Sequence, residues 1–225
     1  DHLAALVGAA GALARPNLPP AAQAAVLEAV LFDKLGYRGD GETYDDLANA
    51  DLMSVIERRK GLPIALSILY LHTARGLGWA AEGVNFPGHF LVRLGAGGGA
   101  LIVDPFDRGA IRAPDELEAM LRGFQGREAR LAPEHLAPAG NRDILLRLQN
   151  NIKMRCLKKR DTAGALGAVE RMALVAPRHP GLWYDAATLN AELGQLRRAR
   201  ACLDTVSRVD TEGRFARQAE TLRAS

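Results

Sequence analysis

The apolar residues between positions 62 and 75 surround every side of the helix that they predict. They fill almost every position of its first half, and a helix that is apolar all round is normally buried. Pro63 falls in the first turn, where the missing N–H costs nothing, and Gly76 or Gly78 can end the helix. The pattern therefore predicts a buried helix over residues 62–75.

After this helix, the spacing changes to an alternation of apolar and polar residues. Residues 79–84 and 90–94 alternate as strands do, and the Asn-Phe-Pro-Gly turn at 85–88 separates them. A glycine-rich segment, 95–99, precedes a third apolar strand at 100–105. The pattern predicts a small antiparallel sheet backed by the buried helix.

Shorter helical patterns flank this central region. We expect helices over 2–13 and 21–34, with Gly36 as the C-cap glycine of the second, and a loop at 37–43. One or two short helices fit residues 44–61, and their N-caps are predicted at Asp45 or Asp46 and at Asn49 or Asp51. A further helix is predicted at 115–121. Helices beside an antiparallel sheet define an α+β fold.

The C-terminal part of the chain is continuously helical and contains an internal repeat. Two pairs of apolar residues lie 34 positions apart, namely Ala165 with Ala199 and Val169 with Leu203 (199 − 165 and 203 − 169). A period of about 34 residues is typical of tetratricopeptide repeats, which are stacked helix-turn-helix pairs. The pattern favours this arrangement over unrelated helical hairpins.

Other positions of the repeat agree with this register. Pro177 takes the closing proline position, Trp183 takes the tryptophan position of the second repeat, and Gly194 marks the turn between its helices. We therefore predict two domains, an α+β domain over residues 1–135 and helical repeats over residues 136–225.

Composition and charge narrow the function classes. The net charge is +3 and the basic residues are spread along the chain, so we expect no nucleic-acid partner. No apolar run reaches the roughly 18 residues of a membrane-spanning helix, and the opening residues lack a signal-peptide pattern. Two cysteines make no disulfide framework and favour a reducing compartment, so we expect a cytoplasmic protein.

No cofactor site is predicted. His72 lies on the buried helix, where a histidine is more often part of the core than a metal ligand, and His135 and His179 stand alone among prolines. No pair of ligands has metal-binding spacing, and the glycine-rich segment lies between strands and does not precede a helix, unlike a phosphate loop. We expect neither a metal nor a cofactor.

Four segments together carry a family resemblance: ERRKGLPIAL at 57–66, NFPGHFLVR at 85–93, IVDPF at 102–106 and the repeats after 141. With these segments the chain resembles the bacterial proteins that join a transglutaminase-like domain to tetratricopeptide repeats, the invasion-regulator-like proteins. The resemblance implies a papain-like domain in which a cysteine begins the central helix and a histidine and an aspartate follow in successive strands. His89 matches that histidine, and Asp104 matches that aspartate.

The nucleophile that the resemblance implies is missing. Residues 61–66 contain no side chain that can attack a carbonyl, and Ser67 should point about half a turn away from a first-turn nucleophile. Cys156 and Cys202 belong to the repeats, where free cysteine usually packs between helices. Removing the nucleophile of a triad costs about a millionfold in turnover, so we expect no catalysis, with His89 and Asp104 as vestigial residues.

Several residues are candidates for ligand binding. Glu57, Arg58 and Arg59, next to Lys60, form a charge cluster near the start of the buried helix, although a charge run is usually a solvated face. Asn85 belongs to a segment that can bind a ligand or simply build the tight turn before His89.

His89 and Trp183 each allow two interpretations. His89 is either an orphaned general base or a structural histidine bonded to Asp104, and Asp104 before Pro105 can also start a turn. Trp183, with Arg197, Arg198 and Arg200, is a candidate contact surface, unless the tryptophan is core and the arginines are solvated.

These observations favour non-catalytic binding of a protein or peptide by a regulatory scaffold. The helical repeats would present a concave surface to the partner, and the degenerate domain would serve as a scaffold or a ligand pocket. The alternative is an amide-bond hydrolase or acyl transferase that uses His89 and Asp104 with an unrecognised nucleophile or with activated water.

Overall fold

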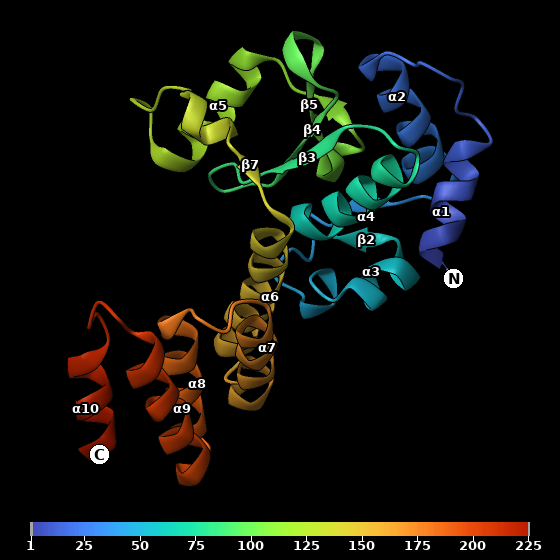
Figure 1. Ribbon diagram of the computed structural model, residues 1–225. Coiled ribbons are helices and arrows are strands. Elements are labelled where there is room, and N and C mark those ends of the chain that lie inside the picture. The colour runs from blue at the N-terminus through green and yellow to red at the C-terminus, as the bar shows by residue number, and fades with distance from the viewer. Residues whose placement is uncertain (1, 225) are drawn as a thin grey trace. The chain divides into compact units, whose positions relative to one another are not determined.

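The computed structural model describes residues 2–224 of the chain (Figure 1). The contacts between residues divide the chain into two compact units, one that ends at Ile144 and one that begins at Leu145. Between the boundary predicted after residue 135 and this division lie a short strand and the first turn of a helix.

The first unit contains helices and short strands in mixed order. Its helices are α1 (His2–Gly11), α2 (Pro20–Leu27), the π-helical η1 (Glu28–Lys34), α3 (Leu52–Arg58), α4 (Pro63–Gly76) and α5 (Pro114–Gln125). Its 3₁₀ turns are η2 (Leu47–Asn49), η3 (Gly97–Gly99), η4 (Pro105–Asp107) and η5 (Pro133–Leu136). Its strands are β1 (Arg38–Gly39), β2 (Lys60–Gly61), β3 (Ala81–Val84), β4 (Leu91–Leu94), β5 (Leu101–Asp104), β6 (Ala110–Ile111) and β7 (Pro138–Ala139).

Five of the strands form one antiparallel sheet in the order β6-β5-β4-β3-β7. The three central strands are the three that the sequence predicted, two from their alternation and one from its apolar run, so the α+β class is confirmed. Strands β6 and β7 were not predicted, and neither was the two-residue parallel pair of β1 with β2, which begins inside the predicted loop at 37–43. Each of these four strands has only two residues, too few to show an alternation.

Helix α4 is the buried centre of this unit, as its apolar residues predicted. Leu62 is its N-cap and Pro63 stands in its first turn, and ten of its residues are buried. It packs against β3 and β4 of the sheet, against α1, and against η4. Helix α5 packs on the other face of the sheet, where Leu117 and Leu121 contact Val84 and Leu91.

The helix predicted over residues 21–34 changes its winding halfway. It is α-helical to Leu27 and then π-helical, and the N–H of Leu35 donates to the carbonyl of Val30, five residues back. Phe32 in the π-helical part is buried and stacks on Tyr70 of α4, with ring centroids 6.4 Å apart. The wider turn places this ring against the buried helix.

The N-caps are Asp46 and Asp51, one from each predicted pair of candidates. The Asp46 side chain accepts from the N–H of Ala48 at the start of η2, and that of Asp51 accepts from the N–H of Ser54 at the start of α3. In both cases the carboxylate satisfies a helix-end N–H that has no partner in the helix.

The second unit is helical throughout its described residues. Its helices are α6 (Asn141–Lys158), which begins in the first unit, α7 (Thr162–Val175), α8 (Pro180–Glu192), α9 (Leu196–Val209) and α10 (Ala216–Ala224). Both ends of α9 lie 34 positions after those of α7 (196 − 162 and 209 − 175), so the helices themselves carry the predicted period. Ala165, Val169, Ala199 and Leu203, the residues that revealed it, are all buried.

Candidate functional site

His89 and Asp104 come together at one end of the sheet. His89 lies in the turn directly before β4, and Asp104 is the last residue of β5. The Nε2 atom of His89 lies 2.9 Å from Oδ1 of Asp104, within hydrogen-bonding distance. The aspartate side chain is 3% exposed and the histidine side chain is 17% exposed. The pair is therefore enclosed on the aspartate side and reachable on the histidine side.

Asp104 is held by more than the histidine. Arg112, which follows β6, donates from Nη2 to Oδ2 of Asp104 at 2.9 Å and to Oδ2 of Asp107 at 2.6 Å. The backbone N–H groups of Phe106 and Asp107 also donate to Oδ1 of Asp104. The carboxylate thus closes the β5–β6 turn and orients the imidazole at the same time.

These contacts set the charge of Asp104. Burial raises the pKa of this carboxyl group, but the hydrogen bonds and charges of His89 and Arg112 outweigh it, so the net pKa of Asp104 lies below its usual value. Asp104 is therefore a carboxylate at neutral pH, an acceptor from both of its partners.

Phe106 forms an aromatic wall beside the histidine. Its ring meets His89 edge to face, with centroids 5.9 Å apart, and it meets Tyr44 in the same way at 6.0 Å. Gly39 of β1 approaches Phe106 so closely that a Cβ atom at this position would lie 2.5 Å from the Phe106 carbonyl oxygen. Strand β1 therefore depends on a glycine to pack behind the wall.

The first turn of α4 carries no group for nucleophilic chemistry. Pro63, Ile64 and Ala65 are apolar and buried. The Ser67 hydroxyl group is also buried and has no hydrogen-bond partner among the described residues, so it makes no bond to His89. Triad chemistry needs a nucleophile next to a base, and none of these four residues provides one.

The two cysteines lie in the second unit, Cys156 in α6 and Cys202 in α9, and are not disulfide-bonded. Burial raises the pKa of the Cys156 thiol, and the nearby Asp161 carboxylate adds to the effect. Burial, followed by the charge of Glu170, also raises the pKa of Cys202. A raised pKa leaves less of the reactive thiolate at neutral pH.

The charged residues before α4 make contacts within the fold. Glu57 is exposed, whereas Arg58 forms ion pairs with Asp40 at 3.5 Å and with Asp46 at 3.6 Å. Arg59 ends α3 in the left-handed conformation, and its guanidinium donates to the Tyr37 hydroxyl. Two of the three residues therefore hold the segment before α4 to the preceding loop.

The remaining binding candidates lie apart from one another along the chain. Asn85 is exposed in the turn after β3. Trp183 is half-buried in α8, packs in two apolar clusters of the second unit, and donates from Nε1 to the Pro177 carbonyl at 2.7 Å. Arg197, Arg198 and Arg200 are exposed on α9. Binding by any of these residues stays a prediction.

Sequence reasoning missed Arg112, Phe106 and Asp40. The signal for Arg112 was its place after Asp-Pro-Phe-Asp-Arg-Gly, a segment with the composition of a tight turn, which would bring residues on either side of it together. Asp40 has no such signal for its ion pair with Arg58, which depends on the fold, whereas its hydrogen bond with Thr43 is local.

The described residues 2–224 hold no group of three or more histidine, cysteine, aspartate or glutamate side chains arranged for a metal ion. Within the same part of the chain, no helix is both long and apolar enough to cross a membrane.

Comparisons with known proteins give relatives for both parts of the chain. The model of the transglutaminase-like superfamily matches residues 1–150, and a tetratricopeptide-repeat model matches residues 152–224. A protein named "UPF0162 protein" from Xylella fastidiosa is 36% identical over 179 residues, which cover 78% of this chain and 64% of that protein. A protein of the same name from Vibrio cholerae is 32% identical over 152 residues, covering 67% of this chain and 56% of that protein.

A shorter match reaches a mouse protein. The F-box only protein 21 of Mus musculus is 43% identical over 88 residues, which are 38% of this chain but 14% of that protein. No solved structure matches the chain. The chain spans less than two thirds of the length of the two bacterial relatives. On the superfamily match over residues 1–150, the chain belongs to the transglutaminase-like superfamily, with tetratricopeptide repeats after the core.

Proposed function

We propose that the protein is a non-catalytic scaffold that binds a protein or peptide partner. The observation that carries this proposal is the first turn of α4, where Pro63, Ile64 and Ala65 stand at the position from which the superfamily's nucleophile would act. These side chains are apolar and buried, so acyl transfer through a covalent intermediate has no attacking atom there.

The contacts of Asp104 support the same proposal. Its carboxylate accepts from His89, from Arg112 and from two backbone N–H groups, and therefore joins two turns of the sheet. This set of bonds gives His89 and Asp104 a role in stability that needs no chemistry. A His–Asp pair can persist for this reason after the nucleophile is gone.

The repeats supply the binding surface in this proposal. Stacked helix-turn-helix pairs form extended surfaces that commonly bind other chains. Arg197, Arg198 and Arg200 are exposed near the start of α9, and an acidic partner would match them in charge. The two unpaired cysteines fit a cytoplasmic location.

Quantitative pull-down from a bacterial lysate tests the binding proposal. The full chain should enrich a discrete partner, and the triple variant Arg197→Glu, Arg198→Glu, Arg200→Glu should lose it. The matched control is Arg127→Glu with Arg130→Glu, two exposed arginines of the first unit. Equal recovery by the triple variant and the control would show that the three arginines of the repeats do not bind the partner. Recovery of no partner by any form of the protein would refute the binding proposal.

One observation favours a second candidate, an amide-bond hydrolase or acyl transferase. The imidazole of His89 is bonded to a carboxylate at 2.9 Å and is still partly exposed, as a general base would be. An unblocked peptide library with detection of released amines tests this candidate. Turnover that disappears in His89→Ala and survives in Cys156→Ala and Cys202→Ala would support it, whereas no turnover above buffer would exclude it.

A further inference from the structure

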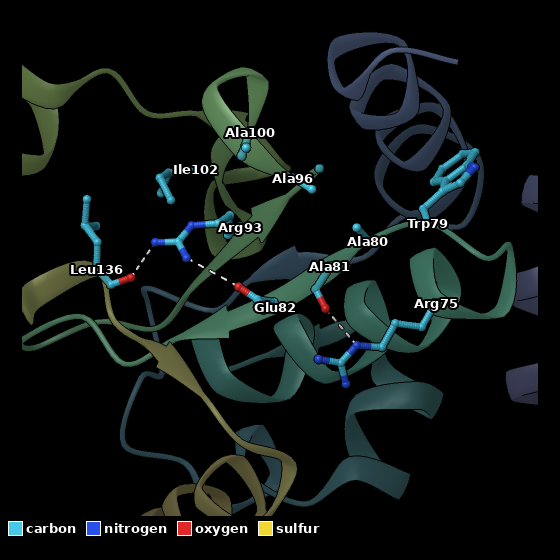
Figure 2. Close-up of a pocket in the computed structure, with 12 residues that line it drawn as sticks. Arg75, Trp79, Ala80, Ala81, Glu82, Arg93, Ala96, Ala100, Ile102 and Leu136 are labelled. Atoms are coloured by element: carbon cyan, nitrogen blue, oxygen red, sulfur yellow. Dashed lines mark hydrogen bonds and ion pairs between the residues drawn. The ribbon is translucent and has the colours of Figure 1, made fainter. Parts of the chain in front are cut away.

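The sheet face that α5 covers is open over part of its length. Side chains two residues apart on a strand point to the same face, so Glu82 shares a face with Val84, and Arg93 shares a face with Leu91. Val84 and Leu91 lie under α5. Glu82 and Arg93 instead line a groove of about 810 Å³, together with Ile102, which the sheet register places beside Arg93 (Figure 2).

Several of the residues that line the groove are small. Ala80, Ala96 and Ala100 line it, and a Cβ atom added to Gly97, which also lines it, would meet no atom within 4 Å. Trp79 and Leu136 lie at opposite ends of the groove in Figure 2. The volume lies within the range of ligand-binding pockets, and its lining combines apolar surface with a few polar groups.

The polar groups of the groove are mainly donors. The Arg93 guanidinium donates to the carbonyl of Leu136 at 2.5 Å and lies 3.3 Å from the Glu82 carboxylate, while Arg75 donates from Nε to the carbonyl of Ala81 at 2.8 Å. The groove therefore has two arginines and one carboxylate in its lining, although only Arg93 contacts that carboxylate, and Figure 2 shows all three side chains.

The contact between Arg93 and Glu82 can be replaced by a contact between Arg93 and a ligand. The Glu82 side chain is 51% exposed, and an exposed ion pair of this kind contributes little to stability. By contrast, the bond from Arg93 to the Leu136 carbonyl holds the guanidinium in place. A carboxylate from outside can therefore take the position of Glu82 on an arginine that is already oriented.

We propose that this groove binds a peptide segment that carries a carboxylate and, further along the segment, an apolar side chain. The carboxylate replaces Glu82 on Arg93, and the apolar side chain packs on the exposed part of the Trp79 ring. The inference rests on the proposed function, since a peptide is its ligand, but it places a binding site in the first unit, separate from the repeats.

The ligand lies across the sheet face in this proposal, because the neighbouring edge is closed. Strand β3 pairs with β7 only at Gly83 and Val84, and beyond that point the Arg75 side chain takes the Ala81 carbonyl. An added strand would need that carbonyl free. Side-chain recognition, and not strand pairing, therefore has to select the ligand.

Fluorescence of Trp79 tests the proposal directly. The chain has two tryptophans, Trp79 and Trp183, so the full chain with Trp183→Phe reports on the groove alone. The probe is the blocked tetrapeptide acetyl-Glu-Leu-Leu-Glu-amide, and its glutamine analogue is the control. A third probe, acetyl-Gln-Leu-Leu with a free C-terminal carboxylate, distinguishes a chain terminus from an acidic side chain as the source of the carboxylate.

Two groove variants should change the affinity in opposite directions. Arg93→Gln should weaken binding of the acidic probe by about tenfold or more, because it removes the charged donor. Glu82→Gln should strengthen binding by about threefold, because it removes the competing carboxylate. Arg127→Gln, an exposed arginine outside the groove, should leave the affinity unchanged.

The outcomes separate this inference from the proposed function. Saturable binding of a carboxylate probe with the opposite effects of Arg93→Gln and Glu82→Gln supports the groove, even if the pull-down recovers no partner. Equal binding of the glutamine analogue, or a fluorescence response to none of the probes, overturns it and leaves the repeats' role standing. Circular dichroism of each variant checks that a loss of binding is not a loss of folding, and if Arg93→Gln is unfolded, the effect of Glu82→Gln decides.

Discussion

Arg160 and Gly194 occupy equivalent positions of the two helical repeats, 34 residues apart (194 − 160), and both adopt the left-handed backbone conformation, with φ of 58° and 71°. Their neighbours bond alike: the N–H of Asp161 donates to the Cys156 carbonyl, and that of Gln195 donates to the Asn190 carbonyl, each at 2.8 Å. Both helices therefore end in the same motif, although only one repeat has glycine there.

Replacing Arg160 with glycine should stabilise the second unit. A residue with a side chain is strained in the left-handed conformation, and the Arg160 side chain is exposed, so its removal should cost little. We expect Arg160→Gly to raise the free energy of unfolding by about 0.5–1 kcal/mol, and Gly194→Ala to lower it by about 1 kcal/mol. Urea unfolding followed by Trp183 fluorescence, with Trp79→Phe, measures both, and a loss of stability in Arg160→Gly would contradict the strain argument.

Replacing Gly39 with alanine should disturb the aromatic wall beside His89. The added methyl group would meet the backbone oxygen of Phe106, which cannot move without shifting the η4 turn. We expect Gly39→Ala to destabilise the first unit by about 1–3 kcal/mol, as overpacked sites do. Gly41→Ala is the control, because a Cβ atom there meets nothing within 4 Å. Thermal unfolding of the two variants should differ, and equal melting temperatures would argue against the close approach.

Removing the charge of Asp104 should reduce stability in a pH-dependent way. Asp104→Asn keeps the shape but loses charged hydrogen bonds in a nearly buried site, which we expect to cost about 2–4 kcal/mol at pH 7. Because the folded-state pKa of Asp104 lies below the unfolded value of 3.8, its contribution is fully present above that value and is lost as the pH falls below it.

Denaturant unfolding of both proteins at several pH values measures this effect. The stability gap between the natural chain and Asp104→Asn should narrow below about pH 4. The control is Asp115→Asn, an exposed carboxylate at the start of α5, which should change stability by about 0.5 kcal/mol at most. A gap that stays constant down to pH 3 would show that the charge of Asp104 does not stabilise the fold.

Shortening Trp183 should destabilise the repeats. Its ring packs in two apolar clusters and its N–H bonds the Pro177 carbonyl, so Trp183→Ala should cost about 2–4 kcal/mol and Trp183→Phe about half of that. Leu174→Ala removes a side chain that is 83% exposed and should cost less than about 0.5 kcal/mol. Circular dichroism at increasing denaturant measures all three, and if Trp183→Ala is as stable as Leu174→Ala, the ring serves a surface role instead.

The parts of the fold that the sequence predicted are those with a local signal. A helix that is apolar on every side over residues 62–75 has to be buried whatever its position in the fold, and in the structure this helix is α4. The 34-residue period follows from the equivalent positions of α7 and α9, which have equal lengths, so two pairs of residues sufficed to detect it. The three longer strands were predicted because each has four residues, enough to show an alternation in β3 and β4 and an apolar run in β5.

The parts that were missed depend on partners outside the segment itself. Strands β6 and β7 have two residues each, and only their neighbours β5 and β3 make them strands. The resemblance placed His89 and Asp104 in successive strands but did not indicate Arg112, whose contact with Asp104 depends on the β5–β6 hairpin. The π-helical winding of residues 28–34, which brings Phe32 against Tyr70, likewise has no local pattern that would predict it.

The bond from Arg75 to the Ala81 carbonyl also bears on how the protein behaves at high concentration. An exposed strand edge can pair with the same edge of another molecule and begin aggregation, and natural sheets block such edges with charged side chains. Arg75 places a cation and an occupied acceptor at the part of β3 that β7 leaves uncovered. Substituting this one residue would open a template for self-association while leaving the core of the sheet intact.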